Sequence, residues 1–350
     1  MSRDSATAAS LEHPLSLVPP LPRFAQIEPT GRCNLACRMC TVQDRADRVV
    51  DQSLADFRAF LDQMPGLETL HLQGLGEPLM NPHFFDMARL ASDRGIRVSS
   101  NTNLTLLTET RARRCVDCGL ASLSVSLDGA EAEVYEAIRR RASFRKVIRN
   151  LDRLIAARDA IGSALEVRGV MVLMRGNLEQ LPALVRLLHA HGVDELLVQR
   201  LSSDLEQADL PPRYFHVRDF VHASELGDAD CAKATEIFNQ AKDIAAALGF
   251  RLHLPRLTNL AHAEHTARSG AARPGCRWPW EGIYLSAAGE LMPCCMVASA
   301  DRASFGTVAK HDAGLLERWH GEAAQAFRQA LASDEPPAVC RSCALYRGTF

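Results

Sequence analysis

The chain has 350 residues, a formal net charge of −2 at pH 7, 47% hydrophobic residues and 23% charged residues. This length allows a large core and one to three domains, and the charge gives no overall field that would attract nucleic acid or anionic lipid. No uninterrupted apolar stretch reaches about 18 residues, and residues 1–22 lack the basic start and apolar run of a signal peptide. We therefore expect a cytoplasmic globular protein without a membrane span.

Strand and helix patterns alternate over roughly the first 200 residues. Strands are expected at 24–28, 67–72, 96–99, 123–127, 165–173 and 193–199. Helices are expected at 53–64, with Ser53 as N-cap, and at 82–93, 107–118, 132–140, 144–159 and 178–191. Strands joined through helices pair in parallel, and several of these strands are apolar throughout, as in strands buried on both faces. The order predicts an α/β fold, either a doubly wound sheet or a barrel, with its active site at the carboxyl ends of the strands.

The pattern is less regular beyond residue 200. A helix is expected at 232–248 and a strand at 250–254, followed by a linker-like stretch rich in Arg, Ala and Gly at 268–275. Ala288-Gly289 lies between two strand-like runs, which predicts a hairpin whose second strand ends at Cys294. We expect a flexible leader at 1–22, a first domain at 23–255 and a cysteine-rich region at 256–350.

Three cysteines, Cys33, Cys37 and Cys40, follow the first strand with three and then two residues between them. This spacing lets one short loop direct three sulfurs toward a common point, and cysteine thiolates are the standard ligands of iron–sulfur clusters. A four-iron cluster held by three thiolates leaves one iron open to a small molecule. A closed zinc site would require a fourth ligand, but no Cys or His occurs in the next 30 residues. A chance trio of packed cysteines is the remaining interpretation.

The C-x3-C-x2-C spacing after a strand resembles the cluster loop of radical S-adenosylmethionine (SAM) enzymes. That resemblance implies a partial (β/α)6 barrel, and an open iron that chelates the amine and carboxylate of SAM. The segment Gly74-Leu-Gly-Glu-Pro78, alone no more than a tight turn, resembles the family's Gly-Gly-Glu-Pro segment, in which backbone and Glu hold the methionine amine. Leu75 departs from that pattern, whereas Gly76, Glu77 and Pro78 match it.

Short polar side chains follow the next strands, in segments 99–103 and 124–129. These segments resemble the Thr-Asn-Gly-like and Ser-x-Ser-x-Asp-Gly-like segments of the family. The resemblance implies that the SAM pocket includes Asn101 or Asn103, Ser126, Asp128 and, at the end of the sixth strand, Gln199. Met39 precedes the third cysteine, where many relatives have an aromatic ring against adenine, and a thioether can pack similarly.

Five cysteines lie in the last 75 residues, namely Cys276, Cys294, Cys295, Cys340 and Cys343. Four of their sulfurs could enclose a second cluster, and zinc bound by four cysteines is the physical alternative. Cys276 and the Gly-x4-Cys step from Gly289 resemble the SPASM and twitch extensions of radical SAM enzymes, which carry auxiliary [4Fe–4S] clusters. The chain ends seven residues after Cys343, which favours the shorter twitch layout with one auxiliary cluster. The expected ligands are Cys276, Cys294, Cys340 and Cys343, with Cys295 as a spare.

Three other features are interpreted as structural. Cys115 and Cys118 also form a C-x2-C pair but fall on an expected helix, where we predict that they pack in the core. Cys231 is a lone cysteine. The run from Arg139 to Arg141 is typical of a solvated helix end.

The resemblance predicts an oxidoreductase that reductively cleaves SAM to a 5′-deoxyadenosyl radical, which takes a hydrogen atom from a small natural-product, sugar or aminocyclitol substrate. An electron donor such as flavodoxin or ferredoxin would serve it, and we expect no nucleic-acid or membrane partner. The alternatives are a peptide-modifying maturase or an epimerase of the same family. An alternative of another class is a non-catalytic iron–sulfur or zinc-binding protein.

Overall fold

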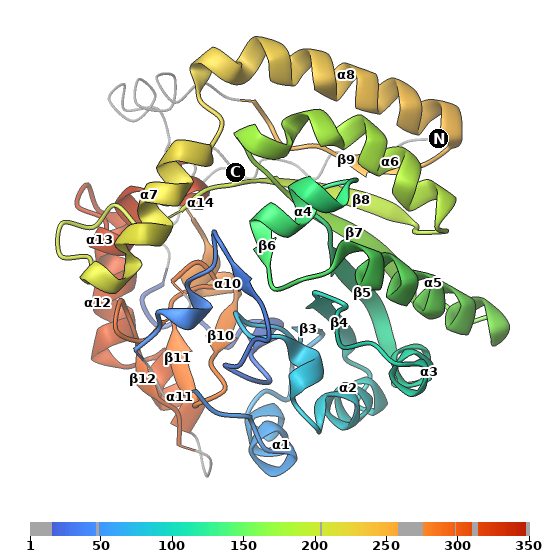
Figure 1. Cartoon of the computed structure of the whole chain (residues 1–350). Helices are drawn as coiled ribbons and strands as arrows, with labels where there is room; N and C mark the ends of the chain where they lie inside the picture. The colour runs from blue at the N-terminus through green and yellow to red at the C-terminus, as the bar shows by residue number, and fades with distance from the viewer. Residues whose placement is uncertain are drawn as a thin grey trace, which may run out of the picture.

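The computed structural model describes residues 16–46, 49–203, 205–257, 276–297, 299–309 and 314–347. Within these ranges one sheet of ten strands runs through the molecule, in the order β12-β11-β10-β1-β3-β4-β5-β7-β8-β9. Figure 1 shows that this sheet is curved and that helices line its outer side. No helix in the described ranges is long and apolar enough to cross a membrane.

The parallel part of the sheet contains the six predicted strands in the predicted order. They are β1 (Phe24–Ile27), β3 (Thr69–His71), β4 (Arg97–Thr102), β5 (Leu120–Ser126), β7 (Glu166–Leu173) and β8 (Glu195–Arg200). Each pairs in parallel with the next, and β9 (Arg251–His253) continues the series beside β8. The prediction of a partial α/β barrel is confirmed, because the helices cover only the outer side of the curved sheet.

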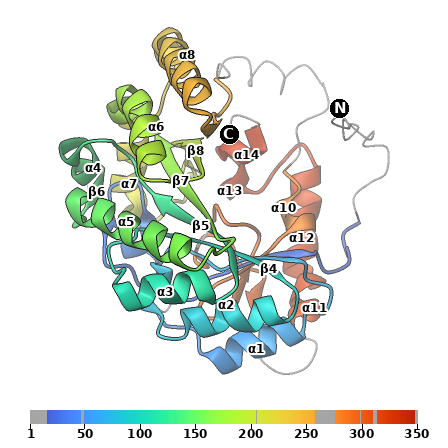
Figure 2. The same ribbon diagram turned by 90° about the vertical axis from the view of Figure 1, so that its right-hand side faces the viewer.

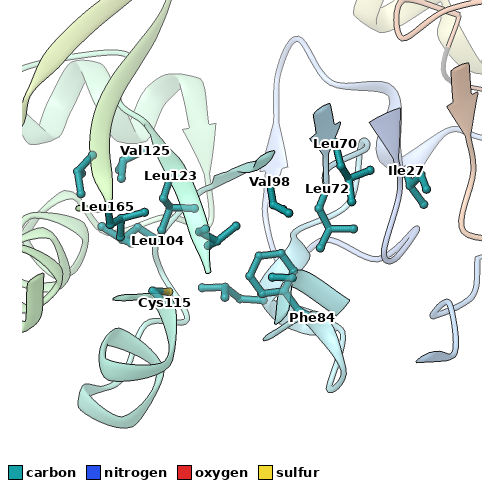
Figure 3. Packing of buried hydrophobic residues seen from close by; sticks show 14 of the residues in the cluster. Ile27, Leu70, Leu72, Phe84, Val98, Leu104, Cys115, Leu123, Val125 and Leu165 are labelled. Atoms are coloured by element: carbon teal, nitrogen blue, oxygen red, sulfur yellow. The ribbon is translucent and has the colours of Figure 1, made fainter. Parts of the chain in front are cut away.

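The helices between the strands pack their apolar faces against this outer side. They are α1 (Leu54–Asp62), α2 (Phe84–Asp93), α3 (Glu109–Asp117), α4 (Ala132–Ile138), α5 (Phe144–Ala160), α6 (Leu181–Ala190) and α8 (Cys231–Leu248). Helix α7 (Phe215–Ser224) packs instead in a separate apolar cluster that includes Met39 of the cysteine loop. Ser53 caps α1 as predicted, because its Oγ accepts a hydrogen bond of 3.0 Å from the backbone N–H of Asp56. Figure 3 shows Leu70, Val98 and Leu123 in the resulting core.

The inner face of the barrel is polar. Successive residues of a strand face opposite sides of the sheet. On β4, Val98, Ser100 and Thr102 are buried on the outer side, whereas Ser99 and Asn101 face inward and are only half-buried. The inner wall is therefore lined by side chains that can form hydrogen bonds rather than by a packed apolar core.

The C-terminal region joins the same sheet. It contains α10 (Trp278–Glu281), β10 (Ile283–Leu285), β11 (Glu290–Met292), β12 (Gly306–Thr307), α11 (Gly314–Trp319), α12 (Glu322–Ala332), α13 (Ala338–Arg341) and α14 (Ala344–Arg347). The predicted hairpin is β10–β11, with Gly289 at φ +86° in its turn. Cys294 lies just beyond β11 rather than at its end. Strand β10 also pairs in parallel with β1, which places the hairpin at the start of the barrel.

One predicted helix ends earlier than expected, for a reason that concerns the cysteine loop. Residues 132–140 were predicted to be helical, but α4 ends at Ile138 and Arg139–Arg140 form the short strand β6. Strand β6 pairs antiparallel with β2 (Ala36–Cys37), a strand inside the cysteine loop that the sequence pattern did not indicate. A long-range pairing thus overrides the local helical pattern.

Part of the expected leader has a defined path. Residues 1–15 lie outside the described residues, but residues 16–20 run along the C-terminal helices (Figure 2). The indole N–H of Trp280 donates to the carbonyl of Ser16 at 2.8 Å, and that of Trp319 donates to the carbonyl of Pro19 at 3.1 Å. The boundary expected after residue 255 stays a prediction, and residues 258–275 beyond it lie outside the described residues.

The fully buried side chain of Arg328, on α12, joins the N-terminal residues to the C-terminal helices. Its guanidinium donates to the carbonyls of Pro279 at 2.8 Å, Trp319 at 2.7 Å and Leu17 at 2.9 Å, and it lies over the Trp319 ring. Burial lowers the pKa of Arg328 to about 10, so the group stays charged at neutral pH.

Replacing Arg328 with Ala leaves three carbonyls without this donor and opens a cavity. We expect the free energy of unfolding to fall by about 3 kcal/mol, measured by denaturant titration under anaerobic conditions. Gln329→Ala, at an exposed position of the same helix, is the control and should change stability by less than about 0.5 kcal/mol. Equal effects of the two variants would contradict this account.

Candidate active site

The predicted cysteine loop follows β1 at the carboxyl edge of the sheet. Cys33, Cys37 and Cys40 are all partly exposed, and the backbone N–H of Cys40 donates to the carbonyl of Cys37 at 3.2 Å. The base of the loop is closed by a bridge between Thr30 and Asp51. The structure therefore brings the three thiols into one compact loop at the end of the barrel where parallel folds place their sites.

The thiols fit a metal cluster better than they fit a free nucleophile. Burial raises the pKa of Cys33 to about 11 and that of Cys40 to about 12, and it also raises the pKa of Cys37. Without a metal these groups would be protonated at neutral pH, whereas thiols that coordinate a metal lose their protons. Within the described residues no three His, Cys, Asp or Glu side chains are arranged to hold a single metal ion. In a four-iron cluster each thiolate binds a different iron, so convergence on one ion is not required.

The glycine loop at 74–77 packs directly against the cysteine loop. A Cβ atom on Gly76 would lie 2.0 Å from the carbonyl oxygen of Thr30, so no other residue fits there without a shift of backbone. The backbone N–H of Glu77 donates to the carbonyl of Arg32 at 2.8 Å. Gly76 thus permits the two loops to lie backbone against backbone.

A buried carboxylate, Glu28, joins these loops to the C-terminal hairpin. Glu28 is fully buried, and its Oε1 lies 2.8 Å from Arg45 Nη1, whose side chain is also buried. The same carboxylate accepts hydrogen bonds from the backbone N–H of Leu75 at 3.0 Å and that of Ala287 at 3.2 Å. Sequence reasoning missed this residue, since nothing local distinguishes Glu28 from an ordinary residue at the end of a strand.

Glu77 is bound within the protein. Its carboxylate accepts hydrogen bonds from Thr102 Oγ1 at 2.7 Å and from the backbone N–H groups of Asn103 at 2.7 Å and Leu79 at 3.2 Å. Burial raises the pKa of Glu77, and these hydrogen bonds oppose that shift. Pro78, the next residue, is buried and begins a 3₁₀ turn. The structure gives Glu77 a role in fixing the loop, and contact with an ammonium group of a ligand stays a prediction.

Asn103 links the end of β4 to the cysteine loop. Its Nδ2 donates to Asn34 Oδ1 at 3.0 Å and lies 3.9 Å from Cys33 Sγ. Three of the predicted residues, Gly76, Glu77 and Asn103, therefore lie together around the first cysteine. Asn103 touches the loop itself, so Asn101 is the better placed of the two candidates to face a ligand.

Three other predicted residues have half-buried side chains at the carboxyl ends of their strands. Asn101, Ser126 and Gln199 lie on β4, β5 and β8, and within the described residues their side chains form no hydrogen bonds to the protein. Polar groups without internal partners at this edge are suited to a bound ligand. Their contact with SAM stays a prediction.

Asp128 occupies a different environment. It is fully buried, its Oδ1 accepts from the backbone N–H of Val172 at 2.8 Å, and its Oδ2 lies 2.7 Å from Arg139 Nε. The interpretation of Arg139 as a solvated helix end is wrong, because this side chain is 8% exposed and its Nη1 lies 3.9 Å from Cys37 Sγ. Arg140 and Arg141 are exposed, as predicted. Direct contact of Asp128 with a ligand stays a prediction.

A polar network lines the inner wall beneath the loops. Gln26 Nε2 donates to Gln73 Oε1 at 3.1 Å, and His71 Nδ1 lies 2.8 Å from Ser99 Oγ. Gln26, His71 and Ser99 are in register across β1, β3 and β4. Burial lowers the pKa of His71 to about 4, so its imidazole is neutral at pH 7. The wall offers uncharged donors and acceptors, and sequence reasoning did not identify it.

The second cysteine set gathers in the C-terminal region. Cys276, Cys294 and Cys340 contact one small apolar cluster with Trp280 and Val339. The backbone N–H of Cys343 donates to the carbonyl of Cys340 at 3.2 Å, so this pair forms one turn. The four predicted ligands therefore belong to the same part of the fold.

The remaining cysteines lie elsewhere. Cys295 packs against a separate pair of buried residues, Tyr284 and Met292, beside Leu75 of the glycine loop. Cys115 and Cys118 are buried in the main core, and their predicted packing role is confirmed. Cys295 thus packs beside the glycine loop, apart from the apolar cluster that contains Cys276, Cys294 and Cys340.

Comparison with known proteins identifies two families. Residues 27–188 match the model of the Radical SAM superfamily, and residues 276–344 match the model of SPASM, an iron–sulfur cluster-binding domain. A tungsten-containing aldehyde ferredoxin oxidoreductase cofactor-modifying protein of Pyrococcus furiosus is 31% identical over 51% of this chain and 51% of its own length. The mycofactocin maturase of Mycobacterium tuberculosis is 30% identical over 47% of this chain and 41% of its own length. The chain thus spans about half the length of these curated relatives or less.

Solved structures share the fold. The SuiB protein of Streptococcus suis, bound to its precursor peptide SuiA, superposes with a TM-score of 0.66 at 17% identity, covering 93% of this chain and 70% of SuiB. The anSMEcpe protein with AdoMet and a peptide bound superposes with a TM-score of 0.64 at 16% identity, covering 94% of this chain and 88% of that one.

Replacing Gly76 with Ala would force the glycine loop away from Thr30. We expect SAM affinity to fall by about tenfold or more, equivalent to about 1.4 kcal/mol, when binding is measured by equilibrium dialysis of anaerobically reconstituted protein. Gly176→Ala is the matched control, since a Cβ atom there meets nothing within 4 Å. Unchanged SAM binding by the Gly76 variant would remove this loop from the proposed site.

Proposed function

Because this chain belongs to the radical SAM superfamily and carries a SPASM iron–sulfur domain, we propose that it is an oxidoreductase acting on a substrate carbon–hydrogen bond. The observation that carries this proposal is the close packing of the cysteine loop and the glycine loop, fixed by Gly76 and Glu28 at the carboxyl edge of the barrel. The [4Fe–4S] cluster and SAM supply reductive cleavage to a 5′-deoxyadenosyl radical, which removes a hydrogen atom from the substrate.

The protein's own residues would hold and orient these groups. Cys33, Cys37 and Cys40 would bind three irons and leave the fourth for the amine and carboxylate of SAM. Gly76, Glu77 and Pro78 would shape the pocket for the methionine end. Around the rest of SAM we place four strand-end side chains that are half-buried or adjoin the cysteine loop: Asn101, Asn103, Ser126 and Gln199. Asp128 would affect the site indirectly, by holding the guanidinium of Arg139 in place.

The C-terminal cysteines would hold one auxiliary [4Fe–4S] cluster, with Cys276, Cys294, Cys340 and Cys343 as ligands. The apolar cluster shared by Cys276, Cys294 and Cys340, and the turn that joins Cys343 to Cys340, support this assignment. An auxiliary cluster can accept the electron that a substrate radical must lose to give an oxidised product. This role makes net oxidation the simplest outcome.

The inner wall favours a small, hydroxyl-bearing substrate such as a sugar or aminocyclitol derivative. The network of Gln26, His71, Gln73 and Ser99 offers neutral donors and acceptors. Neutral His71 offers the substrate a hydrogen-bonding group without a charge. Peptide modification is the second candidate, because similar folds have been solved with peptides bound.

Exposed cations lie on the cysteine loop, on and just after β6 beside it, and at the start of α5, and they suit an acidic electron donor of the flavodoxin or ferredoxin type. These cations are Arg38, Arg140, Arg141, Arg145 and Lys146. Within the described residues, none of their side chains forms an ion pair. Two of them lie in the first turn of α5, where the helix dipole disfavours positive charge. Such unpaired charge increases the rate at which an oppositely charged partner associates.

The reaction class is tested by anaerobic reconstitution with SAM and dithionite. We expect formation of 5′-deoxyadenosine, and about eight irons per chain for two four-iron clusters. Cys40→Ala should abolish 5′-deoxyadenosine and retain the C-terminal iron. Cleavage that persists in this variant would overturn the assignment, and a metal content of zinc alone would favour the non-catalytic alternative.

The donor surface is tested by replacing dithionite with a purified flavodoxin. The double variant Arg140→Glu, Arg141→Glu should slow flavodoxin-driven 5′-deoxyadenosine formation by about tenfold at low salt, with the difference shrinking as salt screens the charges. Dithionite-driven formation should be unchanged. Arg58→Glu, an exposed cation on α1, is the control, and an equal loss in it would contradict the proposed surface.

A further inference from the structure

The buried ion pair of Asp128 and Arg139 also contacts the cysteine loop. Arg139 lies on β6, directly across from Cys37 on β2. Its guanidinium reaches past the backbone pairing to the sulfur, with 3.9 Å between Nη1 and Cys37 Sγ. The backbone N–H of Arg38 donates to the carbonyl of Ile138 at 3.1 Å, so the two short strands are held together on both sides of this contact.

The negative partner is fixed from the opposite side. Asp128 Oδ2 lies 2.7 Å from Arg139 Nε, while its Oδ1 accepts from the backbone N–H of Val172. The side chain of Asn177 donates to the backbone carbonyl of Asp128 at 2.9 Å. Asp128 cannot move without breaking its contact to β7, and Arg139 lies between Asp128 and Cys37, so the pair forms a fixed dipole whose positive end faces Cys37.

The positive end lies beside the cysteine loop. A guanidinium is always charged in proteins, so a full positive charge lies 3.9 Å from Cys37 Sγ. Asp128 is the paired anion, with its Oδ2 2.7 Å from Arg139 Nε.

We propose that Arg139 is a positioning residue that raises the reduction potential of the first cluster, and that the negative charge of Asp128 partly cancels this effect. This inference rests on the proposed function, in which Cys37 is a cluster ligand. Adding an electron makes the cluster more negative, so a fixed cation beside one sulfur stabilises the reduced state and raises the potential. The carboxylate behind it reduces that effect and keeps the potential lower than Arg139 alone would make it.

The two members of the pair should therefore act in opposite directions. At a fixed applied potential, Arg139→Gln should lower the ratio of reduced to oxidised cluster by about tenfold, or about 59 mV for a one-electron couple. Asp128→Asn should raise the ratio, and Arg139→Lys should stay close to the parent. A purely structural pair would give two variants with less cluster but no shifts of opposite sign.

The measurement is a potentiometric titration of the reduced cluster followed by electron paramagnetic resonance. The first-cluster signal is identified as the one absent from Cys40→Ala. Arg113→Gln, at an exposed position of α3 outside the proposed site, is the control, and its ratio should change less than threefold. If a single variant folds poorly, the double variant Asp128→Asn, Arg139→Gln keeps the shape of the pair without its charges and should lie between the two single variants.

The outcomes distinguish failure of the role given to Arg139 from failure of the cluster assignment. A signal that depends on Cys40, with shifts of the same sign or of less than threefold in both single variants, would overturn the role of Arg139 and leave the proposed function standing. Absence of any signal that depends on Cys40 would overturn the cluster assignment and the inference together.

Discussion

The carboxylate of Glu28 is the contact on which the site depends most. Burying a carboxylate is costly unless it is paired, and here it is paired with the equally buried Arg45 and with two backbone N–H groups. Its partners come from the cysteine loop, the glycine loop and the C-terminal hairpin. One charge thus specifies how three segments distant in sequence meet.

This arrangement makes the site rigid where chemistry requires rigidity. Gly76 removes the side chain that would separate the two loops, and Glu77 ties the glycine loop to the end of β4 through Thr102 and Asn103. These contacts are made by residues held in turn by strands rather than by free loops. Precise orientation of a reactive cofactor depends on support of this kind.

Local sequence pattern predicted the parts of this protein that are specified locally. Cysteine spacing, the cap at Ser53 and the hairpin turn at Gly289 depend on near neighbours, and the structure has each of them. The roles of Glu28, Arg139 and His71 depend on residues far away in sequence, brought together by β1 beside β10, β2 beside β6 and β3 beside β4. The local sequence around Arg139 to Arg141 is the same whether all three side chains are exposed or one of them is buried, so it could not predict the burial of Arg139.

The pairing of β10 with β1 has a consequence for how the molecule is made. The strand that covers the free edge of β1 is synthesised long after β1 itself, and the amide of Ala287 that completes the Glu28 contacts lies 259 residues further along the chain. Until then that edge is open to wrong partners. The cysteine loop therefore reaches its final surroundings only after a much later segment of the chain has been made.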